Sequence, residues 1–182
     1  MDARSVSPET AQRTLLLLRH AKAEQVQGKP DQDRELSARG RRDARAVGEW
    51  LRDVSQTGVL ELVLCSTSER TCQTLDAVCA GGASVKDTRF DERIYDASAA
   101  GLIDVLREVP DSVNTVLMIG HAPGIPVLAT ALAQDGAGSA DAAERLSRGF
   151  PTAGLVVLGF EGRWAALGPE TAYLREFVVL RG

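Results

Sequence analysis

The chain has 182 residues, of which 44% are hydrophobic and 25% are charged, a composition that predicts a globular protein with a sizeable core. Its formal net charge of −4 argues against a general nucleic-acid-binding protein, because neutralising a phosphate backbone requires a basic surface. The N-terminal residues are polar and the apolar run Leu15–Leu18 is too short to span a bilayer. Neither a signal peptide nor a membrane partner is therefore expected, and the cytoplasm is the expected location.

The first part of the chain predicts a tail, a buried strand, a loop and a helix. Residues 1–13 lack apolar periodicity and predict a flexible tail, followed by a single domain over residues 14–182. The continuous apolar run Leu15–Leu18 is typical of a strand buried on both faces, and the polar residues 21–36 predict a long loop. Ser37 is expected to cap a helix whose inward positions recur every four or three residues, at Gly40, Ala44, Val47, Leu51 and Val54.

Residues 60–65 form a second apolar run and predict a second strand. Ser66 and Glu69 have the spacing of a capping box, so a helix is expected to begin there and to end near Gly81-Gly82. This helix is expected to bury Cys72 and Cys79 as small hydrophobic side chains. With Cys65 they are the chain's only cysteines, which suggest no disulfide framework and fit a reducing compartment.

The rest of the chain continues the alternation of helices and strands. A helix is expected over residues 99–109 with Ser98 as its cap, then a buried strand over 115–119 and a helix after Pro123-Gly124. Residues 134–149 predict a surface insertion with about one helical turn. Residues 154–160 and 163–167 predict a hairpin, and residues 173–180 an edge strand. The predicted fold class is α/β, a three-layer α/β/α sandwich with a mostly parallel central sheet.

The two histidines, His20 and His121, each follow an apolar strand. Ligands bind at the carboxyl edge of open α/β sheets, so this placement predicts a site. Arg19 supports it, because an arginine at the end of a buried strand requires an anion to offset its desolvation. Arg70 lies near a predicted helix N-terminus at the same edge, where phosphate binds well; the alternative is a surface arginine paired with Glu69 or Asp76.

These residues suit phosphoryl transfer. Guanidinium groups grip phosphoryl oxygens two at a time, and a neutral imidazole is a competent nucleophile near pH 7. Because arginines already supply positive charge, no metal or other cofactor is expected.

Three ordered motifs resemble the histidine phosphatase superfamily. Arg19-His20-Ala21 resembles its Arg-His-Gly signature, the segment 66–74 resembles its Ser-x-x-x-Arg-x-x-Gln-Thr motif, and Gly120-His121 resembles its second histidine motif. The Arg-His-Ala-Lys opening, residues 33–37 and Phe-Pro-Thr at 150–152 are similar to the SixA-like phosphohistidine phosphatase branch. The likeness covers about residues 14–180 and implies a phosphoglycerate mutase-like fold.

The resemblance also implies roles for individual residues. His20 becomes the nucleophile that carries the phosphoryl group, Arg19 and Arg70 bind phosphate, and His121 completes the pocket. Glu92 is the candidate general acid, with Asp91 as the alternative. The substrate implied is a phosphorylated protein carrying phosphohistidine, and short connections suggest an open pocket that could admit it.

Several alternatives stay open at this point. A small phosphorylated metabolite is the substrate if the chain is a broad phosphomonoesterase or a mutase-like enzyme, and a non-catalytic phospho-ligand-binding domain is a remote alternative. A cysteine phosphatase would use Cys65 and Arg70, but only four residues separate them where that family has five, and Glu69 would oppose phosphate. A metal hydrolase is disfavoured, because no acidic cluster accompanies either histidine.

Overall fold

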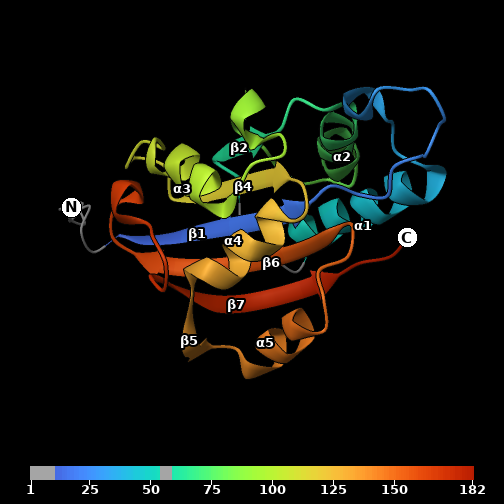
Figure 1. The fold of residues 1–182 in the computed structure, drawn as a ribbon. Coiled ribbons are helices and arrows are strands. Elements are labelled where there is room, and N and C mark those ends of the chain that lie inside the picture. Colours follow the sequence, from blue (N-terminus) through green and yellow to red (C-terminus); the bar gives the residue numbers. More distant parts are fainter. Residues whose placement is uncertain (1–10, 54–58) are drawn as a thin grey trace.

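A seven-stranded mixed sheet crosses the computed structural model, which describes residues 11–53 and 59–182 (Figure 1). The order of the strands is β3-β2-β4-β1-β6-β7-β5. Their bounds are β1 (Gln12–Arg19), β2 (Leu62–Cys65), β3 (Thr88–Phe90), β4 (Thr115–Gly120), β5 (Ala133–Gly138), β6 (Gly154–Glu161) and β7 (Ala172–Val179). β3, β2, β4 and β1 run parallel to one another, whereas β6 is antiparallel to both of its neighbours, β1 and β7.

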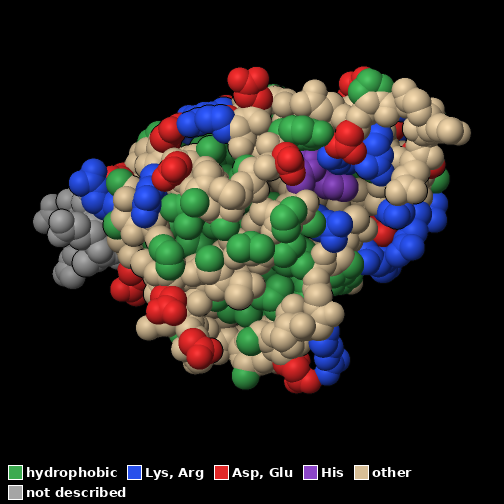
Figure 2. All heavy atoms as spheres, viewed as in Figure 1, with side chains coloured by type: hydrophobic (Ala, Val, Ile, Leu, Met, Phe, Trp, Pro, Cys, Tyr) green, Lys and Arg blue, Asp and Glu red, His purple; other side chains and the backbone are tan. Residues whose placement is uncertain are grey.

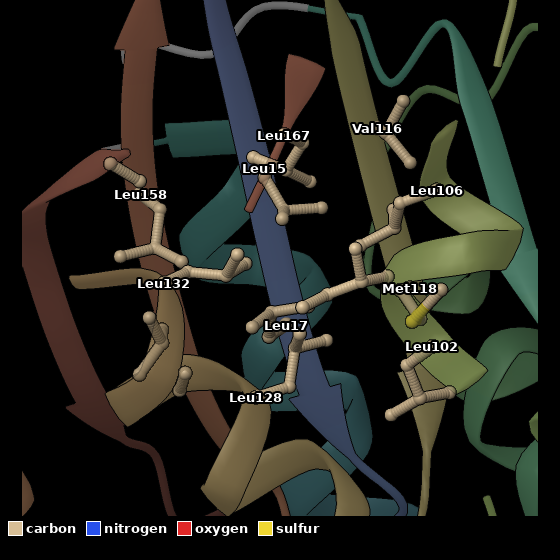
Figure 3. Packing of buried hydrophobic residues seen from close by; sticks show 14 of the residues in the cluster. Leu15, Leu17, Leu102, Leu106, Val116, Met118, Leu128, Leu132, Leu158 and Leu167 are labelled. Carbon is tan, nitrogen blue, oxygen red and sulfur yellow. The ribbon is translucent and has the colours of Figure 1, made fainter. Parts of the chain in front are cut away.

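Helices cover both faces of the sheet. They are α1 (Ala38–Asp53), α2 (Glu69–Ala80), α3 (Ala99–Arg107), α4 (Gly124–Leu132) and α5 (Ala140–Ser147). Successive residues of a strand point to opposite faces, and in β1 Leu16 and Leu18 pack in one cluster with α1 and α2. Leu15 and Leu17 pack in the other cluster with α3 and α4 (Figure 3). This explains why the strand is apolar throughout and confirms the predicted three-layer α/β/α fold.

The sequence correctly predicted the N-terminal caps of two helices, α1 and α3. The amide of Gly40 donates to Oγ of Ser37 (3.0 Å) at the start of α1, and Ser98 caps α3 in the same way.

Val54 and residues 1–10 lie outside the described residues. β1 begins at Gln12, so the sheet includes the last two residues of the expected tail. None of the described helices combines the length and the apolarity that crossing a bilayer requires.

The C-terminal third differs from the prediction in three ways. Residues 134–149 contain strand β5 and the two-turn helix α5, which is more structure than the predicted single turn. The predicted hairpin is wrong, because residues 164–166 form a 3-10 helix and β6 instead pairs with β1 and β7. β7 lies inside the sheet, since β5 pairs with it near Ala172 and Leu174 and forms the edge.

The prediction for the cysteines of α2 is also wrong in part. The buried face of this helix includes Thr71, Thr74, Leu75 and Val78. Cys79 follows that face by one residue, about 100° further around the helix, and is exposed.

Candidate functional site

The carboxyl ends of three neighbouring strands, β1, β2 and β4, meet at a cavity of about 440 Å³. Arg19 is the last residue of β1, and His20 follows it. Arg70 lies in the first turn of α2, the helix after β2, and His121 follows β4. The structure therefore brings together the four residues selected from the sequence. The cavity is lined by Arg19, His20, Lys22, Ala23, Gln25, Asp31, Arg34, Arg70, Tyr95, Asp96, His121, Ala122 and Thr152.

The two imidazole rings are neighbours, with centroids 5.2 Å apart. Figure 2 shows a patch of histidine atoms at the surface, with Lys and Arg side chains and Asp and Glu side chains beside it. Three positively charged arginines line the same cavity, so a doubly charged oxyanion would be held next to both rings.

His20 is held as a neutral ring, and one of its two nitrogens has no hydrogen-bond partner among the described residues. Its backbone amide donates to the carbonyl of Gly120 (2.9 Å), which fixes the residue to the end of β4. Nδ1 lies 2.8 Å from the carbonyl oxygen of Ala21. A carbonyl only accepts, so Nδ1 carries the hydrogen and the lone pair is on Nε2. Burial, with the charges of Arg70 and Arg19, lowers the pKa of His20 to about 4.

Arg19 is partly buried without a carboxylate partner among the described residues. Its Nη1 donates to the carbonyl of Phe150 (2.7 Å), while its buried Nε has no hydrogen-bond partner in the described part of the chain. Burial lowers its pKa, because desolvation penalises the charged form. A bound oxyanion would satisfy this guanidinium in both charge and hydrogen bonding.

Arg70 is buried and belongs to the site. Its Nη1 donates to the carbonyl of Asp31 (2.5 Å), and Nη2 donates to Oδ2 of Asp31 (2.8 Å) and to Nδ1 of His121 (3.2 Å). Pairing with Glu69 or Asp76 at the surface, the alternative considered from the sequence, is therefore wrong. The Nε atom of Arg70 is buried and unpartnered within the described ranges, as is that of Arg19.

The hydrogen bonds of His121 define its tautomer. Nδ1 accepts from Arg70, since a guanidinium only donates, so the hydrogen of the neutral ring is on Nε2 and is donated to Oγ of Ser66 (2.8 Å). Burial, with the neighbouring His20 and Arg70, lowers the pKa of His121 to about 3. In this arrangement His121 orients Arg70 while its ring forms part of the cavity wall.

The segment 66–74 holds the site through each of its motif residues. Ser66 binds His121 through its hydroxyl group. The backbone amide of Ser66 donates to the carbonyl of Ile119 in β4, so Ser66 still belongs to the end of the sheet. Helix α2 therefore begins after Ser68, which is its N-cap. The predicted capping box is therefore wrong. Oε1 of Gln73 accepts from the amide of Leu36 (2.8 Å), and Oγ1 of Thr74 accepts from the amide of Ala21 (3.1 Å). The motif spacing was visible in the sequence, but these positioning contacts were not inferred from it.

Asp31 is a residue of the site that the sequence interpretation missed. Its carboxylate accepts from Arg70, from the hydroxyl of Tyr95 (2.7 Å) and from Nη1 of Arg34 (2.9 Å). The hydrogen bonds from Tyr95, Arg34 and Arg70 hold the pKa of this carboxyl well below its usual range. Asp31 is thus an ionised acceptor that positions Arg70, and the ring of Tyr95 packs edge-on against His121 at 5.3 Å.

The structure does not bring Glu92 to the cavity. Glu92 begins a 3-10 turn, Glu92–Ile94, and is exposed there, while Ile94 enters the core. Asp91, the alternative acid, caps this turn and pairs with Arg93 at 2.7 Å. The chain reaches the cavity at Tyr95, directly after this turn, and the carboxylate it supplies there is that of Asp96, whose φ of 51° is left-handed.

The cysteine alternative does not fit the geometry. Cys65 is fully buried and does not line the cavity. A hydrogen bond with Cys72 and burial both raise the pKa of its thiol, which disfavours the nucleophilic thiolate. Within residues 11–53 and 59–182, His, Cys, Asp and Glu side chains form no group of three that could hold a metal ion.

Comparison with known proteins matches this chain to a family model and to a relative of similar length. A family model described as the histidine phosphatase superfamily, branch 1, matches residues 15–124. An uncharacterized protein of Mycobacterium tuberculosis is 40% identical over 164 residues, which are 90% of this chain and 100% of that protein.

Two solved structures are similar over nearly their whole length. A protein assigned as a candidate phosphohistidine phosphatase SixA of Nakamurella multipartitia has a TM-score of 0.80 and 33% identity, covering 94% of this chain and 98% of its own. A protein of Agrobacterium tumefaciens with the same assignment has a TM-score of 0.72 and 26% identity, covering 91% of this chain and 97% of its own.

Proposed function

This chain belongs to the histidine phosphatase superfamily, and on that basis we propose that it hydrolyses phosphohistidine in proteins through a phosphorylated His20. The observation that carries the proposal is the state of His20. Its ring is neutral, Nδ1 is occupied by the carbonyl of Ala21, and the residue lines a cavity with Arg19 and Arg70. The likeness to the two SixA proteins supports the choice of substrate.

The reaction has two steps. Nε2 of His20 attacks phosphorus, the phosphorus–nitrogen bond of the substrate breaks, and the substrate imidazole leaves neutral when its other nitrogen carries a proton. Water then attacks phosphorus, the bond to Nε2 breaks, and inorganic phosphate leaves. The guanidinium groups of Arg19 and Arg70 stabilise the charge on the phosphoryl oxygens in both steps, and no metal ion is required.

The two carboxylates among the described residues of the cavity lining differ in their ability to protonate a leaving group. Asp31 is ionised and bound by three donors, so it is a poor proton donor. Asp96 is then the remaining carboxylate of the cavity lining. An alkoxide needs a proton as it departs, whereas a protonated phosphohistidine ring does not.

A panel of substrates tests the proposal. We expect kcat/KM to be highest for a phosphohistidine peptide, lower for p-nitrophenyl phosphate and lowest for an alkyl phosphate such as glycerol phosphate. Phosphate release measured at equal enzyme concentration gives the order. An enzyme that cleaves sugar phosphates efficiently but leaves the phosphohistidine peptide intact would contradict the substrate assignment and favour a small-molecule phosphomonoesterase.

Two acidic variants refine the same experiment. Asp96→Asn is expected to slow alkyl phosphates more than the phosphohistidine peptide, because this carboxyl is placed to protonate a departing alkoxide. Glu92→Gln is the matched control, because Glu92 is exposed outside the cavity and should leave the order unchanged. If Glu92→Gln slowed alkyl phosphates selectively and Asp96→Asn did not, Glu92 would be the general acid, as the sequence predicted.

The pKa of His20 predicts the acid limit of activity. Only the neutral ring attacks phosphorus, so kcat/KM should fall as the pH drops through about 4, the lowered pKa of His20. Because the pKa is lowered, activity should persist at pH 5, where an imidazole in water is mostly protonated. The profile is measured with p-nitrophenyl phosphate, and circular dichroism checks the fold at each pH. An acid limb centred near 6.5 would show that the site does not desolvate this ring.

A further inference from the structure

The main chain at Lys22 is fixed, although its side chain is exposed. The carbonyl of Lys22 accepts from the amide (2.9 Å) and Oγ (3.1 Å) of Ser37. Gly40 packs so closely that a Cβ there would lie 2.1 Å from the same carbonyl oxygen. On either side of it, Thr74 holds Ala21 and Leu36 forms a β-bridge with Ala23. The side chain of Lys22 therefore extends from a rigid base at the wall of the cavity.

Among the cations that line the cavity, Lys22 is the one for which the described part of the chain provides no hydrogen-bond or ion-pair partner. Arg34 and Arg70 are both ion-paired with Asp31, and Arg19 donates to the carbonyl of Phe150. The ammonium of Lys22, by contrast, makes no hydrogen bond or ion pair with any residue that the structure describes. Lys29, on the same loop, is paired with Glu35 at 2.6 Å.

The cavity also has room for more than the transferred group. Its volume of about 440 Å³ corresponds to roughly fifteen water molecules at about 30 Å³ each, so a phosphoryl group fills part of it. His121 and Arg70 are buried, whereas Lys22 is exposed. The phosphoryl group bound by the buried residues would leave Lys22 facing the part of the substrate nearer to solvent.

We infer that Lys22 is a specificity-determining residue that binds a second anionic group of the substrate, the carboxylate of an acidic residue next to the phosphohistidine. An ammonium on a flexible stem suits this task, because it attracts an anion without demanding one planar geometry. The free ammonium, the fixed backbone and the spare volume all support this role. The inference rests on the proposed phosphohistidine phosphatase activity.

The test compares two phosphohistidine peptides that differ only in Glu or Gln beside the phosphohistidine. Wild-type enzyme should favour the Glu peptide by about fivefold in kcat/KM, the upper end of what a solvent-exposed ion pair contributes. Lys22→Gln should bring this ratio close to one, and Lys22→Glu should reverse it. Lys29→Gln is the matched control and should keep the wild-type ratio. The preference should also shrink as salt is added.

The outcomes separate this inference from the proposed function. Turnover of both peptides with equal kcat/KM would refute the role of Lys22 alone, whereas no turnover of either would refute both. An equal loss on phosphoramidate and on the Glu peptide in Lys22→Gln would place Lys22 on the phosphoryl group and overturn the inference. The inference would also be overturned if Lys22 produced a preference only for fructose 1,6-bisphosphate over fructose 6-phosphate and none for the Glu peptide. The second anion bound by Lys22 would then be a phosphate group of a small molecule.

Discussion

Replacing His20 with alanine is expected to abolish turnover and the phosphorylated enzyme intermediate together. No other described side chain offers a neutral ring nitrogen to the cavity, because both nitrogens of His121 are hydrogen-bonded to Ser66 and Arg70. Mixing with ³²P-labelled substrate, followed by a rapid denaturing quench, should trap label on the wild-type protein. The bond should be acid-labile and stable to base, as a phosphoramidate is.

Cys65→Ala is the control for this experiment. Cys65 is buried away from the cavity, so the variant should still form the labelled intermediate. If the label disappeared with Cys65→Ala but persisted with His20→Ala, the nucleophile would be Cys65 and the assignment of His20 would be wrong. Circular dichroism of both variants checks that the fold is kept.

Removing the guanidinium of Arg70 should lower kcat by on the order of 10²-fold or more. This is the usual decrease in rate when one preorganised hydrogen-bond donor to a transition state is removed. Arg70→Ala also leaves the Asp31 carboxylate facing the cavity without this partner, and it removes the donor that holds Nδ1 of His121. Arg70→Lys should recover little, because an ammonium cannot make the same paired hydrogen bonds. Single-turnover kinetics with the phosphohistidine peptide would show the loss in the chemical step.

Arg93→Ala is the matched arginine control, since Arg93 pairs with Asp91 and Glu108 outside the cavity and should tolerate removal. EDTA should change neither the wild-type nor the variant rate if the arginines supply the positive charge. Activity that depends on added magnesium or zinc would contradict that account. Near-normal turnover in Arg70→Lys would contradict the paired contact.

The sequence predicted where the site residues at the strand ends lie because that information is local. An apolar run that stops at Arg19-His20, and another that stops at Gly120-His121, locate the carboxyl edge of the sheet without any knowledge of pairing. Parallel pairing of β1 with β4 then places Arg19 opposite Gly120. The two histidines could thus be assigned to one site before the strand order was known.

The parts that were missed depend on contacts between distant segments. Asp31 lies in a polar loop, and only the folded chain shows that it meets Arg70 and Tyr95. Glu92 begins a 3-10 turn that brings Ile94 into the core and leaves Glu92 exposed, away from the cavity. The hairpin after Phe160 was expected from local alternation, but the real partners of β6 are β1 and β7.

The position of β1 in the sheet has a consequence for how the enzyme is made. β1 is synthesised well before both of its neighbours in the sheet, because β4 and β6 are residues 115–120 and 154–161. Such non-local pairing slows folding, because loop closure must precede the contacts that stabilise it. On the ribosome His20 therefore leaves the exit tunnel well before the carbonyl of Gly120 exists to fix it. The proposed anion site is assembled only when the ends of β1, β2 and β4 have come together, so inorganic phosphate should stabilise the folded protein over forms in which these strands are apart.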